Sequence, residues 1–362
     1  MATPRNSSER WLVGGVPRRL TAGGSLRAAH VFAALSERTD AAQIAAFGRR
    51  GMPLLAAAIA TRSRGWRRSL SVASTQLVPP AGLSLFRGPV HPRVLDLHDH
   101  PGRQALAFGL PIDPEHSRAL DKLVARNVDR FARIVVPSAS FGALCAIDPD
   151  RSLVITNGTD TERVRPGPEG GRPDVAMLSG AAAGRGIEQL VEAMTRVRAR
   201  FGDARLRLAL SGTSRHSSAY LRDIKSKLAR PWLSIEAVPY ARIGSFMAGA
   251  AVLVIPHPPN EYMDVATPVK LFDSMAAGRA VVVTPRRETA AIVSACEAGI
   301  VAGSDHVDDL AAAIERLLAD DDLRQRLGEN GRRCAVARYD WKVLSARLAD
   351  EVLGHPERDR SW

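Results

Sequence analysis

Residues 266–285 read Ala266-Thr-Pro-Val-Lys-Leu-Phe-Asp-Ser-Met-Ala-Ala-Gly-Arg-Ala-Val-Val-Val-Thr-Pro285, and they are the most informative segment of the chain for its fold. Thr267 can cap a helix, Pro268 suits the first helical position, and Gly278 ends the helix. The apolar, β-branched run that follows at 280–284 is typical of a strand in a parallel sheet. The stretch therefore predicts a loop, one short helix and a buried strand.

The predicted helix can bind a phosphate at its N-terminus. Unpaired backbone N–H groups and the positive end of the helix dipole lie there, beside the carboxyl ends of parallel strands. One turn along, Asp273 can accept a hydrogen bond from a sugar hydroxyl. A phosphate together with a sugar indicates a nucleotide sugar. The alternative is an ordinary strand–helix unit in which the same residues only delimit the helix.

Length and composition predict a soluble or peripheral protein with two domains. A chain of 362 residues is too long for one small core, and 45% hydrophobic with 24% charged residues is ordinary for globular proteins. Residues 1–10 are polar and precede no long apolar region, so we expect no secretory signal. The longest apolar stretch, 52–61, is about half of what crosses a bilayer.

The cysteines indicate a reducing compartment. Cys145, Cys296 and Cys334 are few and odd in number, and they lack the spacing of metal ligands. We therefore expect reduced cysteines, a cytoplasmic protein and no metal site.

The net charge of +12 is concentrated in the first hundred residues, which hold 14 arginines against five acidic residues. Such a basic region attracts an anionic surface such as acidic lipid, nucleic acid or a phosphorylated acceptor. Residues 52–68 join an apolar stretch to clustered arginines and Trp66. We hypothesise that they dock on the cytoplasmic leaflet near a lipid-linked acceptor, and the alternative is a solvated arginine face on a core helix. A nucleic-acid-binding protein is disfavoured, because only 5% of the residues are aromatic and no binding motif is recognisable.

Strands and helices alternate along the chain, which predicts parallel sheets. The predicted strands are 11–16, 93–97, 134–136, 153–156, 175–178, 206–210, 233–237 and 252–255, with helices at 25–35 and 186–200 and a mostly helical end at 306–353. The predicted fold class is α/β, with two doubly wound Rossmann-like domains facing across a cleft. Residues 1–164 form the predicted acceptor-binding domain and 174–340 the nucleotide-sugar-binding domain. A Pro- and Gly-rich linker at 165–173 joins them, and a tail at 341–362 can cross back to the first domain.

Four landmarks along the chain resemble a known family. They are Gly23-Gly24 after the first strand, Asn157-Gly158-Thr159-Asp160 before the linker, Ser179-Gly180-Ala-Ala-Ala-Gly-Arg185-Gly186 after the next strand, and the opening stretch. The opening stretch is close to the pattern Pro-x-Lys-x-x-Glu-x-Met-Ala-x-Gly-x-Pro-Val. In this order the landmarks resemble a group 1, or family 4, glycosyltransferase of the GT-B fold.

The resemblance implies an enzyme that moves a hexose from a nucleotide diphosphate donor to an acceptor hydroxyl, with retention at the anomeric carbon. The acceptor would be a glycan, a glycolipid or a lipid-linked saccharide, as in polysaccharide biosynthesis at the inner face of a membrane. Neither a metal nor a cofactor is implied, because helix N-termini and Arg185 can stabilise the diphosphate.

The resemblance also implies the residues of the site. The catalytic candidates are His98, Asp99 and Arg185, with His98 beside the donor sugar and His100 as a spare. The donor-binding candidates are Gly23, Gly24, Gly180, Thr267, Pro268, Val269, Lys270 and Asp273. Among them the glycines let backbone approach the diphosphate, the first N–H groups of the helix bind it, and Asp273 holds the ribose. The structural alternatives are a solvated arginine at 185, a tight turn at 23–24 and a His98–Asp99 pair that only shapes a strand end.

Two departures from the family pattern concern activity. Val265 stands eight positions before Asp273, where the family commonly has an acid, with Asp264 and Glu261 nearby. Ala181 stands where the family has an arginine, so Arg185 remains as half of a phosphate-clamping pair. One charge-assisted contact contributes about 1.5–3 kcal/mol, which slows a reaction without abolishing it. We therefore expect an active, divergent enzyme, and the alternative is a catalytically degenerate relative that acts as a binding or partner subunit.

Overall fold

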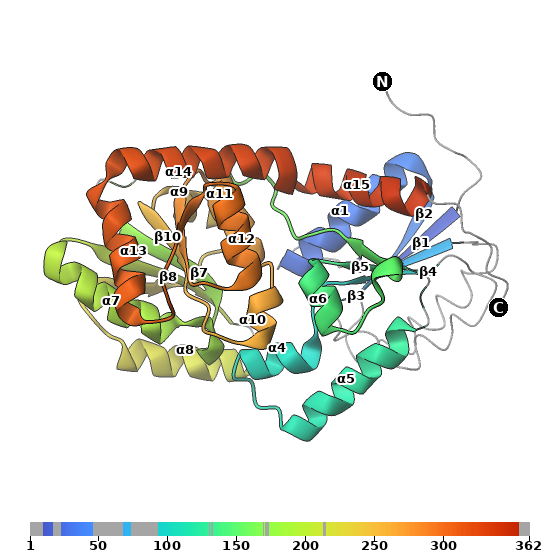
Figure 1. Cartoon of the computed structure of the whole chain (residues 1–362), viewed down its shortest axis with the longest axis horizontal. Coiled ribbons are helices and arrows are strands. Elements are labelled where there is room, and N and C mark those ends of the chain that lie inside the picture. The colour runs from blue at the N-terminus through green and yellow to red at the C-terminus, as the bar shows by residue number, and fades with distance from the viewer. Residues whose placement is uncertain are drawn as a thin grey trace. The chain divides into compact units, whose positions relative to one another are not determined.

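The structure is a computed structural model that describes residues 10–16, 23–45, 68–73, 93–129, 131, 133–168, 170, 174–212 and 215–354. The chain divides into two compact units (Figure 1). The first consists of Met1–Gln104, Ile112–Thr156 and Trp341–Trp362, and the second of Ala105–Pro111 and Asn157–Asp340. Residues 105–111 thus lie in the second unit, although the predicted range of the first domain contains them.

The first unit contains a parallel sheet of six strands in the order β2-β1-β3-β4-β5-β6. The strands are β1 (Arg10–Val16), β2 (Asp40–Ala45), β3 (Arg68–Ala73), β4 (Arg93–Leu97), β5 (Arg133–Val136) and β6 (Ser152–Val154). The sequence pattern missed β2 and β3. The strand order reverses between β1 and β3, as it does in a doubly wound fold.

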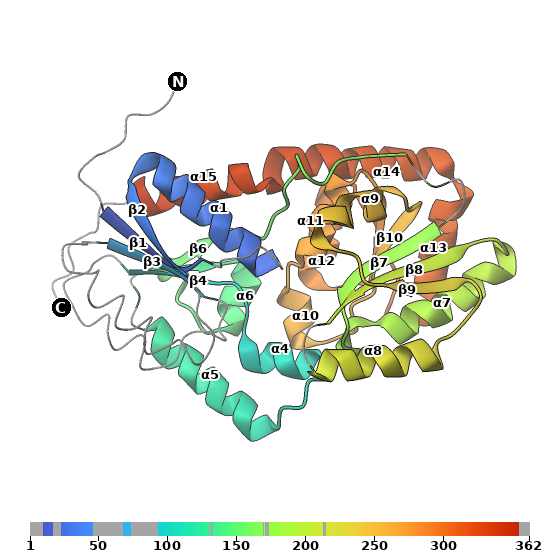
Figure 2. The same ribbon diagram turned by 180° about the vertical axis from the view of Figure 1, so that it is seen from behind.

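Six helices accompany this sheet among the described residues. They are α1 (Gly23–Arg38), α4 (Pro101–Ala107), α5 (Pro114–Val128), α6 (Ala139–Leu144), the 3-10 turn η3 (Pro149–Arg151) and α15 (Trp341–Gly354). The last residues of α4 are counted with the second unit. Helix α15 packs beside α1 (Figure 2), where Trp341 stacks on His30 with ring centroids 5.8 Å apart. The C-terminal helix therefore completes the core of the first unit.

The second unit contains another parallel sheet of six strands, in the order β12-β11-β10-β7-β8-β9. The strands are β7 (Asp174–Gly180), β8 (Arg205–Ser211), β9 (Leu233–Glu236), β10 (Val252–Ile255), β11 (Ala280–Val283) and β12 (Gly299–Val301). The strand order reverses between β7 and β10. In open parallel sheets, ligands bind at this switch point, beyond the carboxyl ends of the strands.

Helices cover both faces of the second sheet (Figure 1). They are η4 (Ala183–Arg185), α7 (Ile187–Arg200), α8 (Arg215–Lys227), η5 (Tyr240–Arg242), α9 (Ile243–Ala248), α10 (Glu261–Val265), α11 (Val269–Ala276), α12 (Arg287–Ala295), α13 (Val307–Ala319), α14 (Asp321–Cys334) and the π-helical turn η6 (Ala335–Tyr339). Val252 and Val254 pack with α7 and α13 on one face, while Leu253 packs with α9 and α11 on the other. The apolar run of β10 is continuous because both of its faces are buried.

The opening stretch folds as a short helix and a buried strand, with one correction to the predicted cap. Pro268, and not Thr267, is the residue before the first turn of α11, and it makes no side-chain capping bond. Thr267 instead accepts a hydrogen bond on Oγ1 from the Asn157 amide at 3.3 Å. Gly278 follows the helix with φ +70°, which favours glycine, and β11 is buried throughout.

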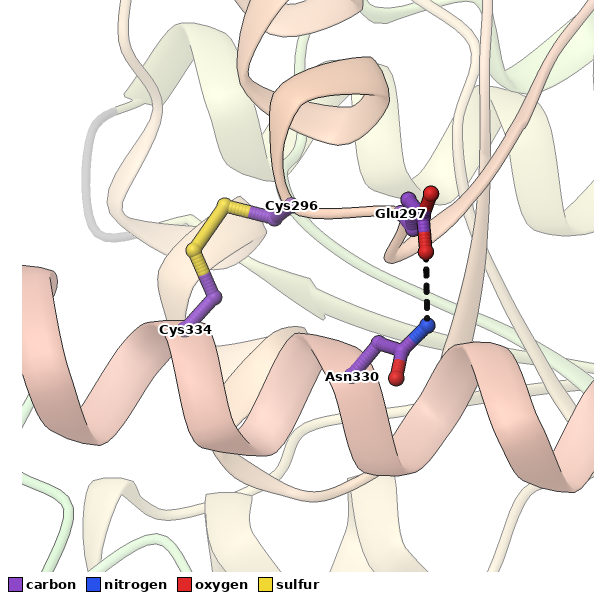
Figure 3. Close-up of a disulfide and its surroundings, with 4 residues drawn as sticks. All are labelled: Cys296, Glu297, Asn330 and Cys334. Atoms are coloured by element: carbon purple, nitrogen blue, oxygen red, sulfur yellow. Dashed lines mark hydrogen bonds between the residues drawn. A yellow bond between two sulfur atoms is a disulfide. The ribbon is translucent and has the colours of Figure 1, made fainter.

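The expectation of three reduced cysteines is wrong for one pair. Cys296 and Cys334 form a disulfide (Figure 3), while Cys145 is free and buried. The two partners are 38 residues apart in sequence, at the ends of α12 and α14. Only the packing of these helices brings them together, so their spacing in sequence gave no signal.

The predicted fold class is confirmed, since both units have Rossmann-like parallel sheets with helices on their faces. Within the described part of the chain, every helix is too short or too polar to cross a membrane. Residues 52–67, which hold most of the predicted membrane-docking segment, lie outside the described residues.

Candidate functional site

Two loops of the second unit meet at the switch point of its sheet. One follows β7 and contains Gly186, and the other follows β10 and begins at Pro256. Gly186 has φ +72°, and a Cβ there would lie 1.8 Å from the Pro256 carbonyl oxygen. Only glycine allows this approach, so the backbone of the two loops is fixed edge to edge where a ligand of this fold class binds.

Arg185 stands directly before Gly186, at the end of the 3-10 turn that precedes α7. Its guanidinium lies 3.6 Å from the centroid of the Phe108 ring. The side chain is therefore held against an aromatic ring, and it is not a freely solvated arginine at a helix start.

The N-terminus of α11 lies in the same unit and carries Lys270 in its first turn. Asn157 fixes the loop before it, because its amide donates to the Thr267 carbonyl oxygen at 2.8 Å. This contact anchors the start of α11 to the turn at Asn157. The first N–H groups of α11, those of Val269 and Lys270, have no acceptor within the helix and can bind an anion.

Asp273 is buried one turn further along α11. The hydroxyl of Thr159 donates a hydrogen bond to its Oδ1 at 2.7 Å. Burial raises the pKa of the Asp273 carboxyl to about 6, although the Thr159 bond and the charge of Lys270 act in the opposite direction. The carboxyl therefore titrates close to neutral pH.

His257 was not among the predicted site residues, yet it lies in the loop after β10, next to Pro256. It follows β10 and is buried, and its Nδ1 has no hydrogen-bond partner among the described residues. Burial lowers its pKa to about 3, assisted by the positive charges of Arg185, Lys270 and Arg286. The imidazole is therefore neutral near pH 7. A polar side chain directly after a buried strand was the signal that could have revealed it.

Arg286 is the second residue that the sequence did not reveal. It is buried just before α12, with its guanidinium 3.1 Å from the Asp264 Oδ1 and 2.6 Å from the Asp305 Oδ1. Asp264 was one of two acids considered in place of the missing acid at Val265. The structure pairs Asp264 with Arg286 and buries Val265.

Ala181 is buried in the core of the second unit, directly after the Gly180 that ends β7. A buried core site cannot take an arginine without unpaired charge or displaced neighbours. The position at which the family pattern has an arginine is therefore occupied here by a buried methyl group that carries no charge.

The remaining predicted residues belong to the first unit. His98 follows β4 and is buried, and neither ring nitrogen has a hydrogen-bond partner in the described part of the chain. Asp99 accepts a bond from the Gln104 amide at 2.8 Å, so a hydrogen-bonded His98–Asp99 pair does not form. The spare histidine, His100, lies 3.5 Å from Asp121. Gly23 is the first residue of α1, which therefore begins before Ser25, the predicted helix start, and includes Gly24.

The structure thus brings Arg185, Thr267, Lys270 and Asp273 into one unit, together with Gly180, Pro268 and Val269. It assigns Gly23, Gly24, His98 and Asp99 to the other unit. The second unit thus has the doubly wound α/β architecture, with an exposed-donor helix start and a glycine-dependent loop at its switch point, which makes this edge of the sheet the candidate ligand site.

Comparison with known proteins specifies this class. Residues 172–320 match the family model described as Glycosyl transferases group 1. Sucrose-phosphate synthase from Thermosynechococcus elongatus superimposes with a TM-score of 0.77 at 15% identity, covering 96% of this chain and 98% of that one. HepE from Anabaena, solved in complex with UDP and glucose, gives 0.75 at 14% identity, covering 95% and 99%. The predicted resemblance to group 1 glycosyltransferases of the GT-B fold is thereby confirmed.

The chain also has curated relatives. One is a GDP-mannose-dependent alpha-(1-6)-phosphatidylinositol monomannoside mannosyltransferase of Mycobacterium tuberculosis, 28% identical over 229 residues. The match covers 58% of this chain and 58% of that relative, so it spans little more than half the length of either protein.

Proposed function

We propose that the protein transfers a sugar from a nucleotide diphosphate donor to an acceptor hydroxyl. The observation that carries the proposal is the close approach of the loops after β7 and β10 at the switch point of the second unit, where Gly186 meets the Pro256 carbonyl oxygen and the neighbouring Arg185 stacks on Phe108. Arg286 is paired with two aspartates, and we assign the binding of the diphosphate to Arg185 and Lys270.

The chemistry of sugar transfer suits this arrangement. The departing diphosphate gains negative charge as the bond to the anomeric carbon breaks, so a site must bind its oxygens more strongly in the transition state than before. Arg185 and the first N–H groups of α11 are groups of this kind. They can do this without a metal ion, and we propose a metal-independent hexosyltransferase that retains the configuration at the anomeric carbon.

The other residues have distinct roles in the proposal. Asp273 accepts hydrogen bonds from the ribose hydroxyls through the oxygen that Thr159 does not occupy. For His98 we propose hydrogen bonds to a sugar hydroxyl, because neither of its ring nitrogens has a hydrogen-bond partner among the described residues and each can make one such bond. Gln104 holds the neighbouring Asp99, so Asp99 shapes the strand end beside His98 and does not itself pair with the imidazole.

For the acceptor we propose a glycolipid or another lipid-linked saccharide at the cytoplasmic face of a membrane. A curated relative is named as acting on a phosphatidylinositol monomannoside, and the first hundred residues of this chain are strongly basic. Flotation with anionic vesicles tests the membrane part. Binding that survives replacement of Arg62, Arg64, Arg67 and Arg68, or no binding at all, would rule out docking through residues 52–68.

Donor binding is tested first, by thermal shift with UDP, GDP, UDP-glucose and GDP-mannose. We expect the compounds that carry one of the two bases, uracil or guanine, to raise the Tm of the protein. This rise in Tm should be lost in Asp273→Ala. Asp203→Ala, which removes an exposed carboxylate from a turn of the same unit, is the matched control and should keep the shift. No shift with any of the four compounds would count against the proposal. Binding without transfer to any lipid-extract acceptor would favour the degenerate partner subunit instead.

A further inference from the structure

Phe108 comes from the first half of the sequence but packs in the second unit. It belongs to Ala105–Pro111, a short segment that the chain contributes long before Asn157, where the rest of that unit begins. The segment lies against the loop after β7: a Cβ on Gly184 would lie 1.7 Å from the Ala107 carbonyl oxygen. The Gly184 N–H also donates to the Phe108 carbonyl oxygen at 3.5 Å. The two segments are therefore in direct backbone contact.

This contact places the Phe108 ring under Arg185. The guanidinium carbon lies 3.6 Å from the ring centroid, which is a close cation–π distance. Tyr262 of α10 meets the same ring edge-on, with centroids 6.1 Å apart and an interplanar angle of 80°. Phe108 is thus held from a second side by the helix that follows the β10 loop.

The stacking has a consequence for what Arg185 can bind. A guanidinium is planar and carries its five N–H donors around its edge, so a ring stacked on one face does not cover that edge. The stacking also restricts the rotamers of Arg185 before an anion binds. The entropy cost of ordering this side chain is therefore smaller at the binding step. This matters more here because Ala181 supplies no second cation.

We propose that Phe108 is a positioning residue of the donor site, which holds the Arg185 guanidinium so that its N–H edge binds the diphosphate. This inference rests on the proposed function, because it takes the diphosphate as the anion at Arg185. It assigns a role to a segment that no sequence motif marked.

The experiment is a double-mutant cycle read by calorimetric binding of UDP and GDP to the full chain. Phe108→Leu keeps an apolar side chain but removes the aromatic face, and we expect it to raise the Kd of the bound nucleotide about 5- to 30-fold. In an Arg185→Ala background the same change should alter Kd less than about twofold, since the ring then has no cation to hold. Phe108→Tyr keeps the aromatic face and should stay within about threefold of the wild type.

Phe201→Leu is the matched control, because Phe201 also lies under an arginine, Arg200, at 5.5 Å and at the far end of α7. We expect it to leave Kd unchanged, which would show that the loss at Phe108 is not a general effect of losing a phenyl ring. Equal losses for Phe108→Leu with and without Arg185 would overturn the positioning role, and so would unchanged binding in Phe108→Leu. Failure of the wild-type protein to bind either nucleotide would instead overturn the proposed function.

Discussion

Thr159 and Asp273 form a buried hydrogen bond, in which the Thr159 hydroxyl donates to the carboxylate at 2.7 Å. Thr159 lies just after the chain enters the second unit, and Asp273 is on α11. The bond ties that entry point to the helix that starts the proposed donor site. Burial raises the pKa of the Asp273 carboxyl to about 6, against the effect of this bond, so its charge depends on pH near neutrality.

The first prediction concerns the cost of keeping Asp273 ionised. Because its folded-state pKa is raised from 3.8 to about 6, its stabilising contribution is complete below pH 3.8 and is lost as pH rises through 6. Asp273→Asn should therefore raise the free energy of unfolding at pH 7.5 by up to about 3 kcal/mol, and by less than about 1 kcal/mol at pH 4. Urea unfolding at the two pH values measures this difference.

Asp273→Asn should also weaken nucleotide binding, because Asp273 is the proposed ribose ligand. A carboxyl with a purely structural role would leave nucleotide binding unchanged. Thr159→Val is the companion variant. It leaves the ionised carboxylate without its donor and should lower stability at pH 7.5 by about 1.5–3 kcal/mol. An Asp273→Asn protein that is less stable than the wild type at pH 7.5 would contradict the prediction.

The second prediction concerns His257, whose contribution to stability depends on pH in the opposite direction to that of Asp273. Its folded-state pKa is lowered from 6.5 to about 3, so its contribution to stability is complete above pH 6.5 and is lost as pH falls toward 3. Between pH 7.5 and pH 5 the wild type should lose about 2 kcal/mol more than His257→Asn. His306→Asn, at an exposed position before α13, is the control and should follow the wild type across this range. Parallel curves for His257→Asn and wild type would refute the buried neutral imidazole.

The sequence predicted the fold through local patterns. The caps and apolar run of 266–285 were sufficient for α11 and β11, because helix ends and buried strands depend on residues close in sequence. Alternating strands and helices then implied parallel sheets, as both units show. Strands β2 and β3 were missed because neither has the unbroken apolar run of β10 and β11.

The residues that sequence reasoning missed depend on distant packing. Phe108 lies more than seventy positions before Arg185, and the two meet only because residues 105–111 join the second unit. Cys296 and Cys334 meet through the packing of α12 and α14. Asp264, a candidate substitute for the acid missing at Val265, is paired with Arg286, which lies 22 positions further along the chain. No local periodicity carries this information.

The third prediction concerns a buried ion pair in the first unit. Arg27 on α1 donates from Nε to the Asp96 carboxylate at 2.7 Å, and both side chains are fully buried. The guanidinium also donates to the carbonyl oxygens of Ile155 at 2.9 Å and Thr156 at 2.8 Å. Arg27→Met should lower the free energy of unfolding by about 3–5 kcal/mol, because it leaves the Asp96 charge buried and unpaired.

Asp96 lies two residues before His98, so the pair also fixes the strand end that carries the proposed sugar-binding histidine. The double variant Arg27→Met with Asp96→Leu removes both charges and should be less destabilised than the sum of the single variants. Purely additive losses in guanidinium unfolding would show that the two charges are not coupled.

The fourth prediction concerns the disulfide that joins α12 to α14. One of its two cysteines, Cys334, is followed directly by the π-helical turn η6. In this turn Tyr339 packs on Phe272 of α11, with ring centroids 4.7 Å apart. Closing a 38-residue separation should stabilise the fold by about 2–4 kcal/mol, so dithiothreitol should lower the Tm of the wild type. A Cys296→Ser/Cys334→Ser variant should start from the lower Tm and show no response to the reductant. Thiol counting in denaturant gives an independent result: one reactive thiol without reductant, that of Cys145, and three with it. Three thiols in protein that was purified and denatured without reductant would show that the pair is reduced in solution.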